Sequence, residues 1–304
     1  MMPTQRSAFL PAALSPASPS AFLPAFLPLT VLLSLSVCSA AAQGQAVPAP
    51  ASSNSAATVS STPSSMPNST PTPAQPDWVV TLGGGVQAGP RYPGSNSTRF
   101  LPIPAVDIEY KNLLFAKQDM PLGVYFINNA QWSAGLAVQY DLTERRASDD
   151  AHLAGLANLP MTPRAKLFGA YTWSALTVSA SAAQDIGGHA EGLVLDVNAI
   201  ATLPLGTQWY LSAGPGVTWG NGQYQSTYFG ITPAQNAASG LPQYTARAGV
   251  NNVYLSLEAD YLLTKHWTAT ANVKIAQLQS DAAHSPITES RQQTTSTLSL
   301  SYSY

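Results

Sequence analysis

Hydrophobic and polar residues alternate with a period of two through most of the chain that follows Pro76. The segment 292–304 is the clearest example, because apolar or aromatic residues alternate in it with Ser and Thr. This period is that of a β-strand with one apolar face and one polar face. The pattern predicts strands near residues 78–88, 100–110, 112–117, 121–127, 131–141, 163–173, 175–184, 192–203, 208–219, 250–262, 266–278 and 292–304.

The length and the faces of these strands favour a membrane barrel over a soluble β-sandwich. They run about ten residues, which suits a tilted strand crossing a bilayer, whereas globular strands have about five or six. Their apolar faces are rich in alanine, too thin for a sandwich core but sufficient against lipid. The tryptophans fall at or near strand ends, where an aromatic girdle would meet the headgroups: Trp78, Trp132, Trp173, Trp209, Trp219 and Trp267.

We therefore predict an all-β protein, a transmembrane antiparallel up-and-down β-barrel of about twelve strands over residues 77–304. Ten strands are the alternative, because the third and fourth segments are short. The tight connections lie at Lys111, 128–130, Ser174, 204–207 and Thr264. The long connections alternate with them and lie at 89–99, 141–162, 220–249 and 279–291. Short periplasmic turns and longer outer loops are typical of an outer-membrane barrel.

The residues before the strands form two segments of different composition. An apolar stretch over 26–37 is too short to span a bilayer, and the A-x-A pattern after it is typical of a cleavable signal peptide. We predict a signal peptide over 1–42, a mature chain that starts near Gln43, and a disordered Ser/Pro/Ala-rich linker over 43–76. The alternative is a lipoprotein acylated on Cys38.

Charge and cysteine content exclude several functions. Only 9% of the 304 residues are charged, the net charge is −2, and no basic stripe is present. We expect no nucleic-acid partner, because nothing would neutralise phosphates. Cys38 is the only cysteine, so signal cleavage would leave a mature chain without disulfides or thiol chemistry.

Three sequence segments form a recognisable series. They read YPGS followed by RFLPIP, then YFGI followed by SGLPQY, then DAAHSPI. In this order and spacing they resemble the MipA/OmpV family, the MltA-interacting proteins of the Gram-negative outer membrane, over residues 77–304. The motif residues that we single out are Tyr92, Gly94, Pro104, Tyr228, Phe229, Gly230, Ser239, Gly240, Leu241, Pro242, Tyr244, Asp281, Ser285 and Pro286.

The resemblance implies a scaffold that brings a lytic transglycosylase and a penicillin-binding synthase together during peptidoglycan growth. Other members are described as porin-like or adhesive, so a small-solute channel or an adhesin is the alternative. The family has no catalytic residues, and we expect neither enzyme activity nor a cofactor.

Isolated charges occur on the polar faces of the strands, which a barrel directs into its lumen. They are Asp107, Glu109, Arg164, Lys166, Asp196, Glu258, Asp260 and Lys274. If these charges pair they can plug the lumen, and if they stay separate they can line a narrow water path. The aromatic residues of loop 220–249 would be unfavourable in water, so we predict that this loop folds inward and constricts the pore.

Other candidate sites are weaker. Asp281, His284 and Ser285 have the residue types of a hydrolase triad, but three residues so close on one loop rarely reach triad geometry. A capped turn is the simpler interpretation. The Asp149-Asp150 pair beside Arg145-Arg146 could bind divalent cations or lipopolysaccharide, although a solvated loop is favoured. The histidines lack metal-ligand spacing: His152, His189, His266 and His284.

The terminal strand predicts how the barrel reaches its membrane. We expect its apolar face to point to lipid and to end in an aromatic residue, the form of the signal that the barrel assembly machinery reads in outer-membrane barrels. This face consists of Leu298, Leu300, Tyr302 and Tyr304. We expect the protein in the cell outer membrane, in contact with its lipid and lipopolysaccharide.

Overall fold

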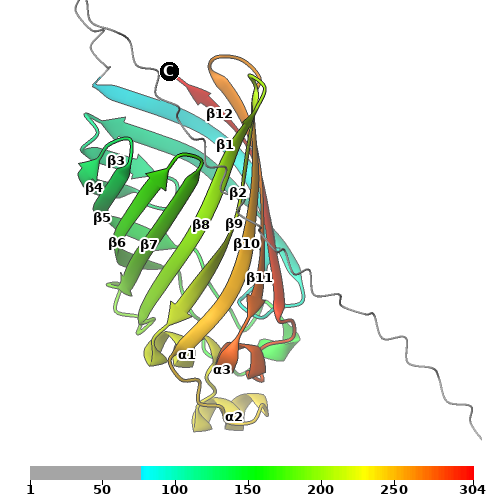
Figure 1. Ribbon diagram of the computed structural model, residues 1–304. Helices are drawn as coiled ribbons and strands as arrows, with labels where there is room; N and C mark the ends of the chain where they lie inside the picture. Colours follow the sequence, from blue (N-terminus) through cyan, green and yellow to red (C-terminus); the bar gives the residue numbers. More distant parts are fainter. Residues whose placement is uncertain (1–76) are drawn as a thin grey trace, which may run out of the picture. The chain divides into compact units, whose positions relative to one another are not determined.

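The computed structural model describes residues 77–304, and the signal-peptide and linker predictions fall on residues outside this range. Twelve strands form one closed antiparallel barrel in which neighbours along the chain pair and the first strand pairs with the last (Figure 1). They are β1 (Trp78–Pro90), β2 (Thr98–Tyr110), β3 (Leu114–Lys117), β4 (Leu122–Asn128), β5 (Trp132–Asp141), β6 (Thr162–Trp173), β7 (Leu176–Asp185), β8 (Leu193–Leu205), β9 (Trp209–Gly220), β10 (Gly249–Leu262), β11 (Trp267–Leu278) and β12 (Gln292–Ser303). The predicted twelve-stranded barrel is confirmed, and the alternative of ten strands is wrong.

The two ends of the barrel differ as the spacing predicts. The connections after β2, β4, β6, β8 and β10 are short and lie together at one end, because the strands run up and down. The opposite end carries the longer connections and all the helices (Figure 1). These are η1 (Ala151–Leu153), α1 (Gly222–Phe229), α2 (Pro233–Ser239) and α3 (Ser280–His284). Within residues 77–304, no helix is long and apolar enough to cross a membrane.

The two-residue period does not predict these helices, but local signals explain them. The Asn221 side chain accepts a hydrogen bond from the backbone of Tyr224 and caps α1. Thr232 and Gln235 form a reciprocal capping box around the start of α2, with Pro233 in its first turn. Gly240 ends α2 at φ 76°, a left-handed conformation that glycine adopts without strain. The sequence Thr-Pro-Ala-Gln therefore has the residues of a helix N-terminus.

The outward face of the sheet is apolar. On the terminal strand Leu298 and Leu300 are 64% and 44% exposed on the isolated chain, while Ser299 points to the other side. Similar outward side chains occur on most other strands, for example Leu82, Leu136, Leu167, Leu195, Leu211 and Leu255. A closed barrel leaves no unpaired first or last strand, and its apolar exterior is suited to lipid.

An aromatic girdle surrounds the short-turn end. In each of its members a tryptophan near the beginning of one strand packs against a tyrosine directly opposite on the next strand. The ring centroids lie 4.5 Å apart in Trp78–Tyr110 and in Trp132–Tyr171, 4.6 Å in Trp209–Tyr261 and 5.1 Å in Trp267–Tyr302. Such rings mark the level of the lipid headgroups.

Glycines on the inner face allow the sheet to bend sharply. A Cβ added to Gly83 of β1 would overlap the backbone carbonyl of Leu300 on β12. Four strands further round the barrel, a Cβ added to Gly214 of β9 would overlap the carbonyl of Ala199 on β8. The close approach of the two backbones thus requires glycine at both corners.

Candidate functional site

Four long connections pack together at the end opposite the girdle and form a cap, made of residues 91–97, 142–161, 221–248 and 279–291. Two apolar clusters hold the cap together. The first contains Leu159, Tyr228, Phe229, Ala246, Leu278, Ala282 and Ala283. The second contains Tyr92, Leu153, Leu156, Ile231 and Ile287. The cap is therefore a small hydrophobic core outside the sheet.

Loop 221–248 contributes the central aromatic residues of the cap. Tyr228 is 1% exposed and Phe229 is fully buried. The guanidinium of Arg145 donates a hydrogen bond to the Tyr228 carbonyl (2.7 Å), and the Ser285 hydroxyl donates to the Phe229 carbonyl (2.7 Å). The burial of Tyr228 and Phe229 fits a loop whose aromatic residues avoid water, and Tyr224 lines a cavity of the lumen. That the loop folds inward and constricts a pore stays a prediction.

The three motif segments lie side by side in the cap. The Tyr92 hydroxyl donates to Oε2 of Glu289 (2.7 Å), and the Gly94 carbonyl accepts from the backbone of Glu289 (2.8 Å). These bonds join the first segment to the residues just after the third. The Tyr244 hydroxyl donates to the Asp281 carbonyl (2.9 Å), which joins the second segment to the third.

The remaining motif residues also have structural roles in the cap or beside it. The Pro286 carbonyl lies 2.8 Å from Nε2 of His152. The Ser239 hydroxyl binds both the backbone carbonyl of Gln235 and the amide of Leu241 at the end of α2. Pro242 follows as an exposed loop residue, Gly230 ends α1, and Pro104 lies on β2. Sequence reasoning found these residues but not their mutual contacts.

The structure does not assemble the candidate triad. The Asp281 carboxylate accepts from the backbone amide of Arg247 (2.7 Å), and Nδ1 of His284 lies 2.7 Å from the Ser280 carbonyl. Ser285 is buried and its hydroxyl is bound to the carbonyl of Phe229. The three side chains thus have separate partners. Across residues 77–304, no group of three His, Cys, Asp or Glu side chains is suited to hold a metal ion.

One residue of the basic and acidic pairs in loop 142–161, Arg145, is buried rather than solvated. Arg145 is 1% exposed, and burial lowers its pKa to about 10, so the residue stays charged at neutral pH. The Asp149 carboxylate binds the Arg146 amide and the Asp150 carboxylate binds the His152 amide, so both acids shape turns. The interpretation of a solvated loop is wrong for Arg145, because its side chain holds loop 221–248.

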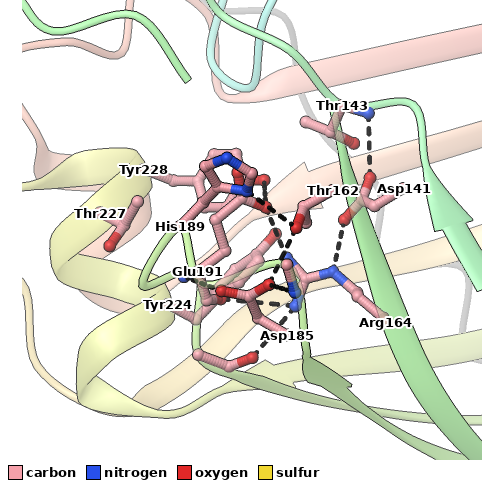
Figure 2. A network of polar contacts seen from close by, with 12 residues as sticks. Asp141, Thr143, Thr162, Arg164, Asp185, His189, Glu191, Tyr224, Thr227 and Tyr228 are labelled. Atoms are coloured by element: carbon pink, nitrogen blue, oxygen red, sulfur yellow. Dashed lines mark hydrogen bonds and ion pairs between the residues drawn. The ribbon is translucent and has the colours of Figure 1, made fainter. Parts of the chain in front are cut away.

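A buried polar network joins the cap to the barrel wall (Figure 2). Arg164 of β6 forms ion pairs with Asp141 of β5 (2.8 Å) and with Glu191 of the β7–β8 connection (3.0 Å). The Tyr228 hydroxyl of α1 donates to the same Oε2 of Glu191 (2.7 Å). Glu191 is fully buried. Strand β5 and the β7–β8 connection therefore meet at one arginine, and α1 joins them through Glu191.

The surroundings of Glu191 explain its electrostatics. Burial raises the pKa of the Glu191 carboxyl, although the hydrogen bond from Tyr228 and the charge of Arg164 act in the opposite direction. Nearby, Thr162 donates to Asp185 (2.8 Å), and Asp185 accepts the backbone amide of Glu191 (3.0 Å). Sequence reasoning placed Arg164 in the lumen but missed Glu191, because one acid in a short loop carries no periodic signal.

Most other lumen charges bind partners on adjacent strands. Lys117 of β3, which sequence reasoning did not single out, pairs with both Asp107 (3.2 Å) and Glu109 (2.9 Å) of β2. Lys166 lies 3.9 Å from Asp119. These charged side chains therefore lie along the inner face of the barrel wall.

The acidic side chains of β8 and β10 accept hydrogen bonds from uncharged side chains. Asp196 accepts from the Tyr254 hydroxyl (2.8 Å), Glu258 accepts from Asn272 (3.0 Å) and Asp260 accepts from Thr270 (2.6 Å). Lys274 lies opposite Ser256 in the register, and its ammonium stands 3.7 Å from the centroid of the Tyr254 ring. Two cavities of about 310 Å³ and about 210 Å³ remain in the capped barrel.

A closed barrel with an apolar exterior, an aromatic girdle and a polar lumen defines an outer-membrane β-barrel protein. The family model described as MltA-interacting protein MipA matches residues 82–304. The chain belongs to this MipA family.

Comparisons with individual proteins are more distant. The putative outer membrane protein YiaT of Escherichia coli, from strains K12 and O157:H7, is 30% identical over 112 residues, which are 36% of this chain and 44% of YiaT. The match thus spans less than half the length of these relatives. Similar solved structures include the NanC porin (9% identity, 73% of this chain and 98% of that chain, TM-score 0.42) and the COG4313 outer membrane channel from Pseudomonas putida F1 (8%, 76% and 97%, 0.38).

Proposed function

We propose that the barrel is a non-enzymatic anchor in the outer membrane that holds peptidoglycan-remodelling enzymes on its periplasmic side. The partners would be a lytic transglycosylase and a penicillin-binding synthase. Membership of the MltA-interacting family supports this assignment. The observation that carries it is the packed cap: a barrel mouth filled by its own folded loops suits a protein whose working surface lies elsewhere.

The short-turn end is the proposed contact surface. With the girdle at the inner headgroups, the turns 111–113, 129–131, 174–175, 206–208 and 263–266 face the periplasm. The predicted linker 43–76 precedes β1, which begins at this same end. The cap then faces outward, where it contacts lipopolysaccharide, and insertion relies on the barrel assembly machinery.

A binding measurement with variants at both ends tests this function. The full chain in detergent is immobilised, and a purified lytic transglycosylase from the same cell is titrated against it. We expect deletion of residues 43–76, or replacement of turn 206–208 by a Gly-Ser turn, to weaken binding about tenfold or more, the effect of losing about 1.4 kcal/mol. The matched control replaces residues 234–239 in the cap and should bind unchanged. No binding by the unaltered chain, or loss only in the cap variant, would contradict the proposal.

A small-solute channel is the second candidate, and the two lumen cavities are the observation that favours it. Planar-bilayer recording separates the two functions. A silent barrel supports the anchor, and reproducible conductance steps from the unaltered chain support the channel. Binding of the cap to a host surface would instead support an adhesin.

A further inference from the structure

The barrel wall has a gap beside β2. Strand β1 pairs with β2 along its whole length, but β3 pairs only with Asp107–Tyr110. Residues 98–106 therefore have no partner strand on that side within the described chain. Across the gap, Arg99 forms an ion pair with Glu144 (3.0 Å) and donates to the Leu142 carbonyl (3.4 Å). Side chains alone bridge the two edges.

Two prolines prevent another strand from filling this gap. The Lys111 amide donates to Asp77, on the β1 side, so alternate residues of β2 counted back from Lys111 point their N–H groups toward β1. Pro102 and Pro104 belong to the other set, whose backbone nitrogens face the gap. Because proline has no N–H, an added strand would find no donor at either position. The occupant of the gap is therefore not a β-strand from a partner protein.

The two edges of the gap are apolar on the outer face of the barrel. Phe100 of β2 is 73% exposed, and Tyr140 and Leu142, at and just after the end of β5, are 44% and 41% exposed. Unpaired backbone groups are costly against hydrocarbon and are tolerated where they line a polar cavity. Such a cavity lies directly behind them.

The cavity of about 310 Å³ reaches both edges of the gap, at Leu101 on β2 and at 142–144, and extends inward to Tyr224. Its charged lining residues are three cations, Arg91, Arg99 and Lys274, and one carboxylate, Glu144. The excess of positive charge attracts an anion.

Two polar groups inside the cavity lack a strong partner. Within the described chain the Lys274 ammonium forms no ion pair and contacts the ring of Tyr254. The side-chain oxygen of Asn252 is buried and accepts no hydrogen bond from residues 77–304. An anionic head would pair with the Lys274 ammonium, and a head that also carries a hydroxyl would in addition donate to the Asn252 oxygen.

We propose that this gap is a lateral portal through which a single-chain anionic amphiphile passes between the membrane and the lumen. The carboxylate or phosphate head binds Lys274 and Arg99, while the acyl chain lies between Phe100 and Leu142 in the lipid. The proposed passage of an amphiphile through the gap does not depend on an enzyme partner.

Binding in nanodiscs of neutral lipid tests the head-group site. The fluorescent fatty acid 11-(dansylamino)undecanoate is titrated against the full chain and corrected with empty nanodiscs. We expect Lys274→Met to weaken binding about tenfold, the effect of losing one charge-assisted hydrogen bond, and Lys274→Arg to restore it. The control Lys166→Met removes a lumen cation that lines the other cavity and should bind as the unaltered chain does. Equal affinity of Lys274→Met and Lys166→Met would overturn the proposal.

Competition identifies the class of head group and the need for a chain. Displacement by oleate alone assigns a fatty acid, and displacement by oleoyl lysophosphatidate alone assigns a lipid phosphate. Neither inorganic phosphate nor acetate at the same concentration should displace the probe. If either ion displaces the probe as well as oleate does, the cavity is a site for soluble anions and the portal is wrong.

Photocross-linking tests lateral access separately. p-Benzoyl-phenylalanine is placed at Leu101, on the inner face beside the gap, at Ser181 on the inner face of β7, and at the lipid-facing Phe100. We expect lipid adducts by mass spectrometry at Phe100 and Leu101 and none at Ser181. Adducts at Phe100 without any at Leu101 would show that the gap is closed to lipid and would refute the portal.

Discussion

Replacement of Arg164 by methionine should loosen the cap selectively. This guanidinium forms ion pairs with both Asp141 and Glu191, and through Glu191 it joins β6 to the loop that carries Tyr228. Removing one partner from a buried ion pair costs about 3 to 5 kcal/mol, because an uncompensated charge remains. The lower end of that range applies, since Asp141 keeps 20% of its side chain exposed. We therefore expect a loss of about 3 kcal/mol in the stability of the closed cap.

Hydrogen exchange of the amides in α1, measured by mass spectrometry on nanodisc-embedded protein, reports this opening. A loss of about 3 kcal/mol corresponds to exchange about a hundredfold faster. Arg146→Met is the matched control, because Arg146 is 61% exposed in its pair with Glu144. An exposed pair is worth at most about 1 kcal/mol, so exchange should rise less than about fivefold. Equal exchange in the two variants would refute the role of Arg164.

The pH dependence of this variant distinguishes the loss of a charge partner from a general loosening. Burial already raises the pKa of Glu191 in the closed cap, and removing the positive charge of Arg164 raises it further. A carboxyl whose pKa is raised stabilises the closed state at low pH, and this contribution is lost as the pH rises through the raised pKa. The cap of Arg164→Met should therefore be tighter near pH 4 than near pH 8, after correction for intrinsic exchange. Arg164→Met with Glu191→Gln should lack most of that dependence.

Three further predictions concern export and the barrel wall. Leu300→Asp should sharply lower the amount of heat-modifiable barrel in the outer membrane, because a mid-bilayer charge on the lipid face costs up to about 2 to 4 kcal/mol. Ser299→Asp places its charge on the inner face and should be tolerated. Equal amounts of the two variants would contradict the face assignment. Gly83→Ala should cost about 1 to 3 kcal/mol in urea unfolding through overpacking, whereas Gly84→Ala, whose nearest neighbour would lie at 3.8 Å, should not. Intact-mass measurement should give a mature chain beginning near Gln43, and an added diacylglyceryl mass would contradict this.

The strands could be predicted because each one has its own alternation of apolar and polar residues in the sequence. The segment 292–304 carries enough alternation to fix both its type and its lipid-facing side, and the structure places Leu298 and Leu300 outward. The gap beside β2 could not be predicted in this way. The prediction gave Phe100 to Tyr110 one continuous strand, and nothing in that segment reveals that β3 reaches only its last four residues.

Partners across the lumen depend on register, which alternation leaves undetermined. Lys274 shares a face with Glu258 and Asp260, but the register places it opposite Ser256, and its ammonium contacts Tyr254. Glu191 is another example, since it becomes the central acid of the cap only because a loop folds back over β6. Two-residue shifts in pairing would change these contacts and still keep every side chain on the same face of the sheet.

The contacts among the motif residues also limit what family resemblance can say about function. Tyr92 binds Glu289, Tyr244 binds the backbone of Asp281, and Ser285 binds the backbone of Phe229, so the motifs mainly describe how the cap closes. The proposed enzyme contacts lie at the opposite end of the barrel, among short turns that carry none of these residues. Two barrels could therefore share the cap and bind different partners, which makes the turns, rather than the motifs, the positions at which partner specificity should be tested.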